Sequence, residues 1–153
     1  MAKTTENLYR AIINGCMDGP FVVDDLPVAG LLYPRFETST YTDSSGIERT
    51  SPADVEIISD KVQKGGGTSM FDVEGWFGYS NWRYFLVPNG TEYPESLFIK
   101  KGKSVRTNRA GNLKGRHYQI EPKNPMTVGT FKGALDNFAR NAVVKQVELS
   151  RVK

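Results

Sequence analysis

The chain has 153 residues, of which 39% are hydrophobic and 24% charged, with a net charge of +3, and this suits one folded domain spanning residues 1–153. No segment approaches the roughly 18 consecutive apolar residues of a membrane helix, and the amino end lacks the apolar segment of a secretory signal, so no membrane partner and no signal peptide are expected. Because Cys16 and His117 are the only cysteine and histidine, the sequence predicts a metal-free, disulfide-free domain working in a reducing cytosol.

Short extended segments and turns dominate the first 67 residues. Leu8–Ile13 is an apolar run closed by Asn14 and Gly15, which predicts a buried strand containing one arginine. Residues 18–50 are rich in Gly, Pro and Ser turn signals. The segment Ser51–Asp54 combines a serine cap, a proline and an acid, which predicts a short helix ended by the three glycines at 65–67.

The middle of the chain carries further strand signals. Thr68–Phe71 favours a strand, and Trp82–Pro88 gives the strongest strand signal, followed by a turn at Asn89 and Gly90. Ser96–Ile99 and His117–Ile120 are further candidate strands, the second ended by Glu121 and Pro122. Four aromatic residues of this region are predicted to lie in the core: Trp76, Trp82, Tyr84 and Phe85.

The tail has a different periodicity. Phe131, Leu135, Phe138 and Ala142 recur at steps of four, three and four, which predicts an amphipathic C-terminal helix. On it, Asp136 is expected to anchor the helix to the sheet or to pair with a cation one turn away. Short strands followed by one good helix predict an α+β fold.

Positive charge is concentrated toward the carboxyl end. Residues 1–99 carry 7 Lys/Arg and 14 Asp/Glu, whereas residues 100–153 carry 13 Lys/Arg and 3 Asp/Glu. Seven of these cations, and no acid, fall between Lys100 and Arg116. This stretch is either a solvated loop kept open by repulsion or a surface that binds phosphates or an acidic protein. Charge alone does not choose among a nucleotide, RNA and an acidic partner.

Three features have side chains suited to chemistry. The glycines at 65–67 allow a ligand to approach the backbone, and the adjacent hydroxyls of Thr68 and Ser69 offer hydrogen bonds; the alternative is a flexible turn, and the spacing is not that of a phosphate-binding loop. Arg10, inside a strand, either clamps a phosphate or carboxylate or forms a structural ion pair. Strand alternation places His117, Gln119 and Glu121 on one face.

Taken together, these segments resemble a known family, the type six secretion effector toxins with an ADP-ribosyltransferase-like fold, which a small dedicated immunity protein binds. Residues 37–50 and the basic stretch match this family poorly. The matching segments occur in family order over nearly the whole length: Leu8–Ala11, Leu31–Phe36, Gly66–Asp72, Val87–Glu92, His117–Pro122, Pro125–Met126 and Leu135–Ala142.

The resemblance implies an α+β domain with two small antiparallel sheets and a cleft between them. It also implies a toxin delivered into a recipient cell, acting in its cytosol, and neutralised by an immunity protein at the cleft or its rim. The implied activity is ADP-ribosyl transfer from nicotinamide adenine dinucleotide (NAD), as substrate, onto a macromolecule, either protein or RNA. Two alternatives remain: a hydrolase of NAD or RNA-directed toxin, and a non-catalytic toxin that sequesters an anionic partner through its basic half.

Residue roles follow from the same resemblance. Arg10 takes the place of the first-strand arginine that clamps NAD, aided by Tyr9 or Phe71 stacking on a ring of the substrate. Gly67 with the hydroxyls of Thr68 and Ser69 takes the place of the segment that fixes the ribose. The third catalytic position is filled by His117, which the family shares, or by Glu121 of the segment Gln119–Glu121, which has the Q-x-E pattern of many ADP-ribosyltransferases.

Overall fold

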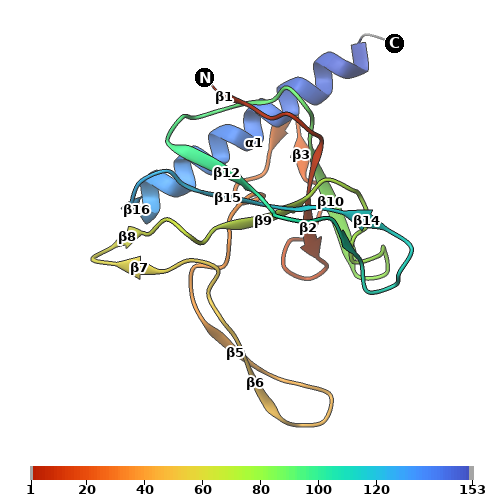
Figure 1. Ribbon diagram of the computed structural model, residues 1–153, viewed down its shortest axis with the longest axis vertical. Helices are drawn as coiled ribbons and strands as arrows, with labels where there is room; N and C mark the ends of the chain where they lie inside the picture. Colours follow the sequence, from red (N-terminus) through yellow and green to blue (C-terminus); the bar gives the residue numbers. More distant parts are fainter. Residues whose placement is uncertain (1, 152–153) are drawn as a thin grey trace.

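A five-stranded antiparallel sheet packed against one long helix forms the body of the molecule, and the computed structural model describes residues 2–151 (Figure 1). Every neighbouring pair in the sheet is antiparallel, as expected where hairpins and loops rather than crossover helices join the strands. The strands, in spatial order, are β10 (Trp82–Val87), β2 (Leu8–Ile13), β9 (Thr68–Phe71), β15 (His117–Pro122) and β12 (Leu97–Lys101).

The helix α1 (Val128–Arg151) covers one face of this sheet (Figure 1). It begins where the Thr127 hydroxyl accepts a hydrogen bond from the Thr130 amide, a side-chain cap that offsets the weak helix propensity of Gly129 and Gly133. The predicted apolar stripe is fully buried, and it packs on the alternate apolar side chains of the strands. The predicted strands, terminal helix and α+β class are thereby confirmed. The sheet side chains in this core include Leu8, Ile12, Met70, Phe85, Val87, Tyr118 and Ile120.

Short peripheral strands lie around the central sheet and helix. Each forms a two-stranded pair except β16, β8 and β7, which make a three-stranded piece. The paired elements are β1 (Ala2–Lys3) with β11 (Glu92–Tyr93), β3 (Val22–Val23) with β4 (Leu26–Pro27), β5 (Ser39–Thr42) with β6 (Glu48–Ser51), β13 (Arg106–Thr107) with β14 (Lys114–Gly115), and β7 (Ile57–Ile58) with β8 (Lys61–Val62) and β16 (Met126–Thr127).

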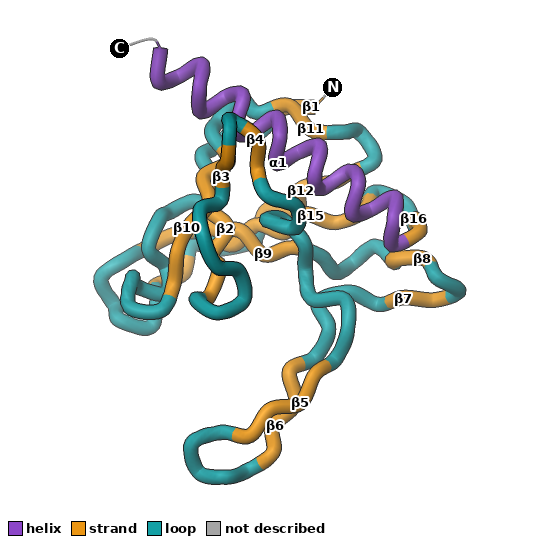
Figure 2. Tube along the Cα trace, turned by 180° about the vertical axis from the view of Figure 1, so that it is seen from behind, coloured by secondary structure: helices purple, strands orange, loops and turns teal. Residues whose placement is uncertain are grey.

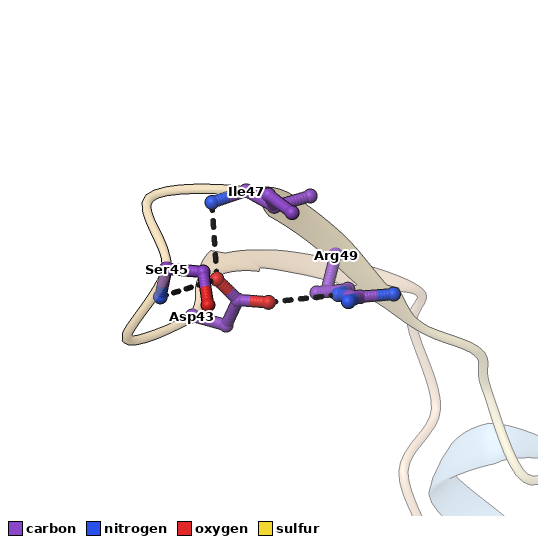
Figure 3. A network of polar contacts seen from close by, with 4 residues as sticks. All are labelled: Asp43, Ser45, Ile47 and Arg49. Atoms are coloured by element: carbon purple, nitrogen blue, oxygen red, sulfur yellow. Dashed lines mark hydrogen bonds and ion pairs between the residues drawn. The ribbon is translucent and has the colours of Figure 1, made fainter.

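The hairpin β5–β6 projects away from the body in both views (Figures 1 and 2). Its turn is stabilised by its own side chains: the Asp43 carboxylate accepts hydrogen bonds from the amides of Ser45 and Ile47 and from Arg49 Nε at 2.9 Å (Figure 3). The bond from Arg49 is the main cause that holds the pKa of Asp43 below its ordinary value. The tip of the hairpin is therefore ordered without support from the core.

Two sequence predictions are wrong. No helix starts at Ser51, because Asp54 bonds to the Arg35 backbone instead of capping a turn: its amide donates to the Arg35 carbonyl and its carboxylate accepts from the Arg35 amide. Of the four aromatic residues predicted to be core, only Phe85 is. Trp76, Trp82 and Tyr84 are half-buried, and strand alternation puts the last two on the face that α1 does not cover.

The basic stretch is also more ordered than a repelled loop. Part of it extends β12, and another part folds back as the β13–β14 hairpin. The Asn108 side chain fixes this hairpin, since its Oδ1 accepts from the Leu113 amide and its Nδ2 donates to the Trp76 carbonyl at 3.2 Å. Local hydrogen bonds thus overcome the mutual repulsion of the cations.

The central sheet is weakly joined at one place. β2 and β9 pair at a single position, Tyr9 opposite Phe71, whereas β2 and β10 pair over six positions. Beyond Tyr9, the remainder of β2 has no ladder to β9. The sheet therefore divides into two antiparallel half-sheets, β10–β2 and β9–β15–β12, and we call the stretch where β2 and β9 are not paired the opening.

Candidate active site at the opening between two half-sheets

Arg10 occupies this opening. Its Nη1 donates to the Ser69 carbonyl at 3.2 Å and its Nη2 donates to the Tyr33 carbonyl at 2.9 Å. These bonds replace part of the missing strand ladder, because the Ser69 carbonyl belongs to β9 and Arg10 to β2. The structure thus brings Arg10 and Ser69, residues 59 positions apart, into contact.

The guanidinium of Arg10 lacks an anionic partner within the part of the chain that the structure describes. Its Nη1 and Nη2 donate to neutral carbonyls, and its Nε is buried without a hydrogen-bond partner among the described residues. Burial lowers its pKa, and Asp54 opposes that effect without forming an ion pair within residues 2–151. Since an uncompensated buried cation is costly, this geometry is suited to an anionic ligand.

The backbone carbonyl of Tyr33 orients Arg10, and a hydrogen bond between the Tyr33 side chain and Asp136 holds that residue in place. The Asp136 carboxylate on α1 accepts from the Tyr33 hydroxyl at 2.7 Å and from the Gly30 amide at 3.1 Å. Burial, together with this bond, raises the pKa of Tyr33 to about 12, so the phenol stays protonated and donates. Asp136 therefore anchors the helix to the 30–33 segment and positions Arg10 through it.

The two predicted hydroxyls lie on opposite sides of β9. Thr68 is fully buried, and its hydroxyl donates to the Leu32 carbonyl at 2.6 Å, a structural contact beneath the sheet. Ser69 is half-buried on the face away from α1, where it pairs with Gln119. Strand alternation forces this separation, because consecutive side chains point to opposite faces.

Gly67 and Glu121 lie at the far end of β15. A Cβ on Gly67 would overlap the Ile120 carbonyl oxygen, so glycine is needed for the close approach of the two strands. Glu121 is buried and its Oε1 accepts from the Gly65 amide at 3.3 Å, while its Oε2 accepts from Gln119 Nε2 at 3.0 Å. This carboxylate thus fixes the glycine segment, and Gln119, which donates a hydrogen bond to it, is paired with Ser69 on β9.

A row of rings crosses the uncovered face next to the opening. Phe71 pairs with Tyr9 on one side and with His117 on the other, and the Phe71 and His117 rings are 5.5 Å apart. His117 is half-buried, and burial, followed by the nearby Arg106, lowers the pKa of its imidazole. The ring is accordingly neutral at pH 7, when it can accept or donate a hydrogen bond without adding charge.

Three cavities lie away from Arg10 and Ser69. Spaces of about 270, 480 and 130 Å³ open beside α1 and the amino-terminal strand, and none of these three is lined by a predicted site residue. Within residues 2–151, no group of three or more His, Cys, Asp or Glu side chains is arranged to hold a metal ion. In the same range, no helix is long and apolar enough to cross a membrane.

Sequence reasoning assigned no site role to Tyr33, and it expected Asp136 either to anchor the helix or to pair with a cation. Tyr33 contributes a backbone carbonyl, and because every residue has one, the residue type at position 33 does not indicate this role. Gln119 was named only as one of three polar side chains that alternation places on one face, with His117 and Glu121.

Two antiparallel half-sheets, a strand arginine at their junction and a serine on the facing strand are the features that the resemblance to ADP-ribosyltransferase-like domains implies. Residues 9–147 match the family described as Tse2 ADP-ribosyltransferase toxin. Toxin Tse2 of Pseudomonas aeruginosa (strain PAO1) is 30% identical over 162 residues, which cover 97% of this chain and 95% of that protein.

The chain belongs to the Tse2 ADP-ribosyltransferase toxin family. It is a cytotoxic effector with ADP-ribosyl transfer activity, and NAD is the substrate that ADP-ribosyltransferases use. The predicted family, fold class and enzyme class are thereby confirmed.

Proposed function

We propose that NAD binds across the opening between β2 and β9 and that its ADP-ribosyl group is transferred to a macromolecule in the cytosol of a recipient cell. The observation that carries this proposal is the Arg10 guanidinium, which has a buried, unpartnered Nε and no carboxylate pair within the described residues. A diphosphate supplies the negative charge that such a cation needs. Family membership supplies the reaction class.

Each nearby side chain then has a role. Arg10 holds the phosphates, and the Ser69 hydroxyl, on the uncovered side of β9, fixes the ribose. Tyr9 and Phe71, paired across the junction, offer ring faces to the nicotinamide or adenine. The hydroxyl of Thr68 keeps its bond to the Leu32 carbonyl and acts through the position of β9.

The reaction needs a polar group near developing positive charge. NAD supplies the ADP-ribosyl group when the bond between ribose and nicotinamide breaks, through a transition state with positive charge on the ribose. The neutral imidazole of His117 accepts a hydrogen bond there without repelling that charge. Glu121, linked through Gln119, is the second candidate for this role, because it places a carboxylate two residues along the same face.

Nicotinamide release by the purified chain tests this site. Arg10→Lys keeps the charge but loses the forked geometry, and we expect release to fall about a hundredfold, as when one preorganised donor is lost. Arg83→Lys is the matched control, since Arg83 also lies on a strand and donates to two carbonyls, those of Gly19 and Met17, away from the opening. Equal loss in both variants, or none in Arg10→Lys, contradicts the proposal.

The same assay separates the remaining activities. Free ADP-ribose as the main product indicates a hydrolase, whereas ADP-ribosyl attached to a macromolecule indicates a transferase. Cell killing that survives Arg10→Lys with no NAD consumption indicates a non-catalytic toxin. We further propose that a cognate immunity protein covers the opening or its rim, in which case adding it blocks nicotinamide release.

A further inference from the structure

An aromatic cluster and a basic hairpin meet beside the proposed NAD site. The aromatic cluster consists of Phe71, Trp76, Phe77, Trp82 and His117. The basic hairpin spans residues 103–114 and carries Lys103, Arg106, Arg109 and Lys114, all exposed. Figure 1 shows the turn after β9, the start of β10 and the hairpin at β14 gathered at one end of the sheet.

Direct contacts join the two groups. Asn108, inside the basic hairpin, donates to the Trp76 carbonyl at 3.2 Å. Gly115 lies so close to the Trp76 ring that an added Cβ would be 3.1 Å from it. Trp76 in turn stacks on Phe71 at 4.8 Å between ring centroids, and Phe71 pairs with His117. The rings and the cations therefore form one continuous surface that reaches the proposed site.

The cations of this surface are available to a ligand. Within residues 2–151, no ion pair links any of the four cations of the basic hairpin to a carboxylate. The nearby carboxylate of Asp72 is already engaged, because its Oδ1 accepts from the Arg116 amide at 2.8 Å. Glu74, in the same turn, interacts with Tyr9 and Tyr79. The net field at the basic hairpin is thus positive and attracts polyanions.

The rings favour one class of polyanion. Phe77 stacks on Trp82 at 4.5 Å and is 48% exposed, and Tyr79 in the same turn is 65% exposed. Rings presented beside unpaired cations are suited to single-stranded nucleic acid, whose bases stack on the rings while its phosphates meet the cations. An acidic protein can also engage both groups, but single-stranded nucleic acid places a ring beside every phosphate along its length.

We propose that the acceptor of the ADP-ribosyl group is single-stranded nucleic acid, bound by the aromatic cluster and the basic hairpin. This inference rests on the proposed NAD site. In the transfer step, an oxygen or nitrogen of the nucleic acid forms the bond to the ribose carbon while the bond to nicotinamide breaks. The bonding electrons leave with nicotinamide, which becomes neutral, and the acceptor gives up one proton to solvent.

Binding is tested with a fluorescent single-stranded RNA 20-mer and the same sequence as DNA, by anisotropy at several salt concentrations. The variant Lys103→Gln/Arg106→Gln/Arg109→Gln/Lys114→Gln should bind about tenfold more weakly, with a salt slope smaller by about 3, since each phosphate contact contributes about 0.7. The matched control Lys64→Gln/Lys123→Gln/Arg140→Gln/Arg151→Gln removes the same charges from exposed positions elsewhere and should bind like the parent chain. Equal weakening in both variants overturns the proposal.

The contribution of the rings is tested separately. Phe77→Leu should weaken binding at least about threefold without changing the salt slope, because stacking is lost and charge is kept. Phe98→Leu is the control, since Phe98 on the edge strand β12 is 45% exposed and lies outside the aromatic cluster. Unchanged affinity in Phe77→Leu contradicts a stacked base at this position.

Transfer is read with labelled NAD in the presence of the RNA, the DNA and a bacterial lysate. Label on an oligonucleotide, lost in the four-cation variant while nicotinamide release persists at a pH high enough to keep His117 neutral with or without Arg106, supports the proposal. Label confined to lysate proteins overturns it but leaves the NAD site standing. Loss of nicotinamide release in Arg10→Lys is scored without any acceptor, so failure of the site and failure of the acceptor assignment remain distinct.

Discussion

The two faces of the central sheet use aromatic residues in opposite ways. Beneath α1, rings such as Phe85 and Phe138 are buried among aliphatic side chains and contribute to stability. On the uncovered face, Phe71 and Phe77 stack on tryptophans and leave part of the cluster exposed. The same strands therefore provide a packed core on one side and a surface for ligands on the other, and Arg10 reaches from the covered side into the opening between them.

Removal of one ring from each face gives the largest contrast. Phe138→Ala empties a fully buried site against Tyr93, and we expect the free energy of unfolding to fall by about 3–5 kcal/mol. Phe77→Ala deletes the same atoms from a half-exposed site, and we expect a loss below about 1 kcal/mol. Urea denaturation followed by circular dichroism measures both.

Phe138→Leu guards against a variant that does not fold. It keeps most of the buried volume and should lie between the parent and Phe138→Ala in stability. If Phe77→Ala proves as destabilising as Phe138→Ala, the uncovered face is part of the core, and its rings are not free to bind a ligand.

The covered face was predictable because packing imposes a period on the sequence. Phe131, Leu135 and Phe138 repeat at helical spacing, and Leu8–Ile13 is a continuous apolar run closed by a turn. The absence of the helix expected at Ser51 could not be predicted in this way. The serine, proline and acid are all typical of a helix start. Asp54, however, forms hydrogen bonds with the Arg35 backbone, and such long-range hydrogen bonds leave no local sequence pattern.

The candidate site was predictable in part. Arg10 and Ser69 were expected to meet, and the structure places them in contact. Strand alternation explains why Thr68 is buried in the core and Ser69 lies on the uncovered face. That assignment can be made only once β9 is known to be covered on one side. The supporting contact of Tyr33 depends on a carbonyl and on Asp136, which lies 103 residues away.

Asp136 connects α1 to the 30–33 segment that holds Arg10, and its loss should have an intermediate effect. Asp136→Asn weakens the hydrogen bonds from the Tyr33 hydroxyl and the Gly30 amide, and we expect the free energy of unfolding to fall by about 1–2 kcal/mol. Glu148→Gln is the control, because that exposed carboxylate has only a 3.6 Å pair with Lys145 and should change stability by less than about 0.5 kcal/mol.

A second readout distinguishes positioning from simple anchoring. If Asp136 positions Arg10, nicotinamide release should also fall in Asp136→Asn at temperatures where the variant is fully folded. Full activity in the folded variant restricts Asp136 to holding the helix on the sheet.

The smallest effect expected is a shift in the pKa of His117 on the uncovered face. As the chain has one histidine, its ring protons give one set of signals in an NMR titration. Burial lowers the pKa of His117 below its ordinary value of 6.5, and Arg106 adds to this, so the midpoint in the folded chain should lie below that in urea. Arg106→Gln should raise the midpoint, whereas Arg109→Gln should leave it unchanged.

The sign of the pH dependence follows from the same shift. Between the two midpoints the unfolded chain binds the proton more readily than the folded chain, so stability falls as pH drops through about 6.5 toward the folded midpoint. Above pH 6.5 both forms are neutral and the histidine contributes no slope. A folded midpoint at or above 6.5 would put positive charge on the imidazole near neutral pH, where it would repel the charge that develops on the ribose. His117 would then be excluded as the group near the reacting carbon, and Glu121 would take its place.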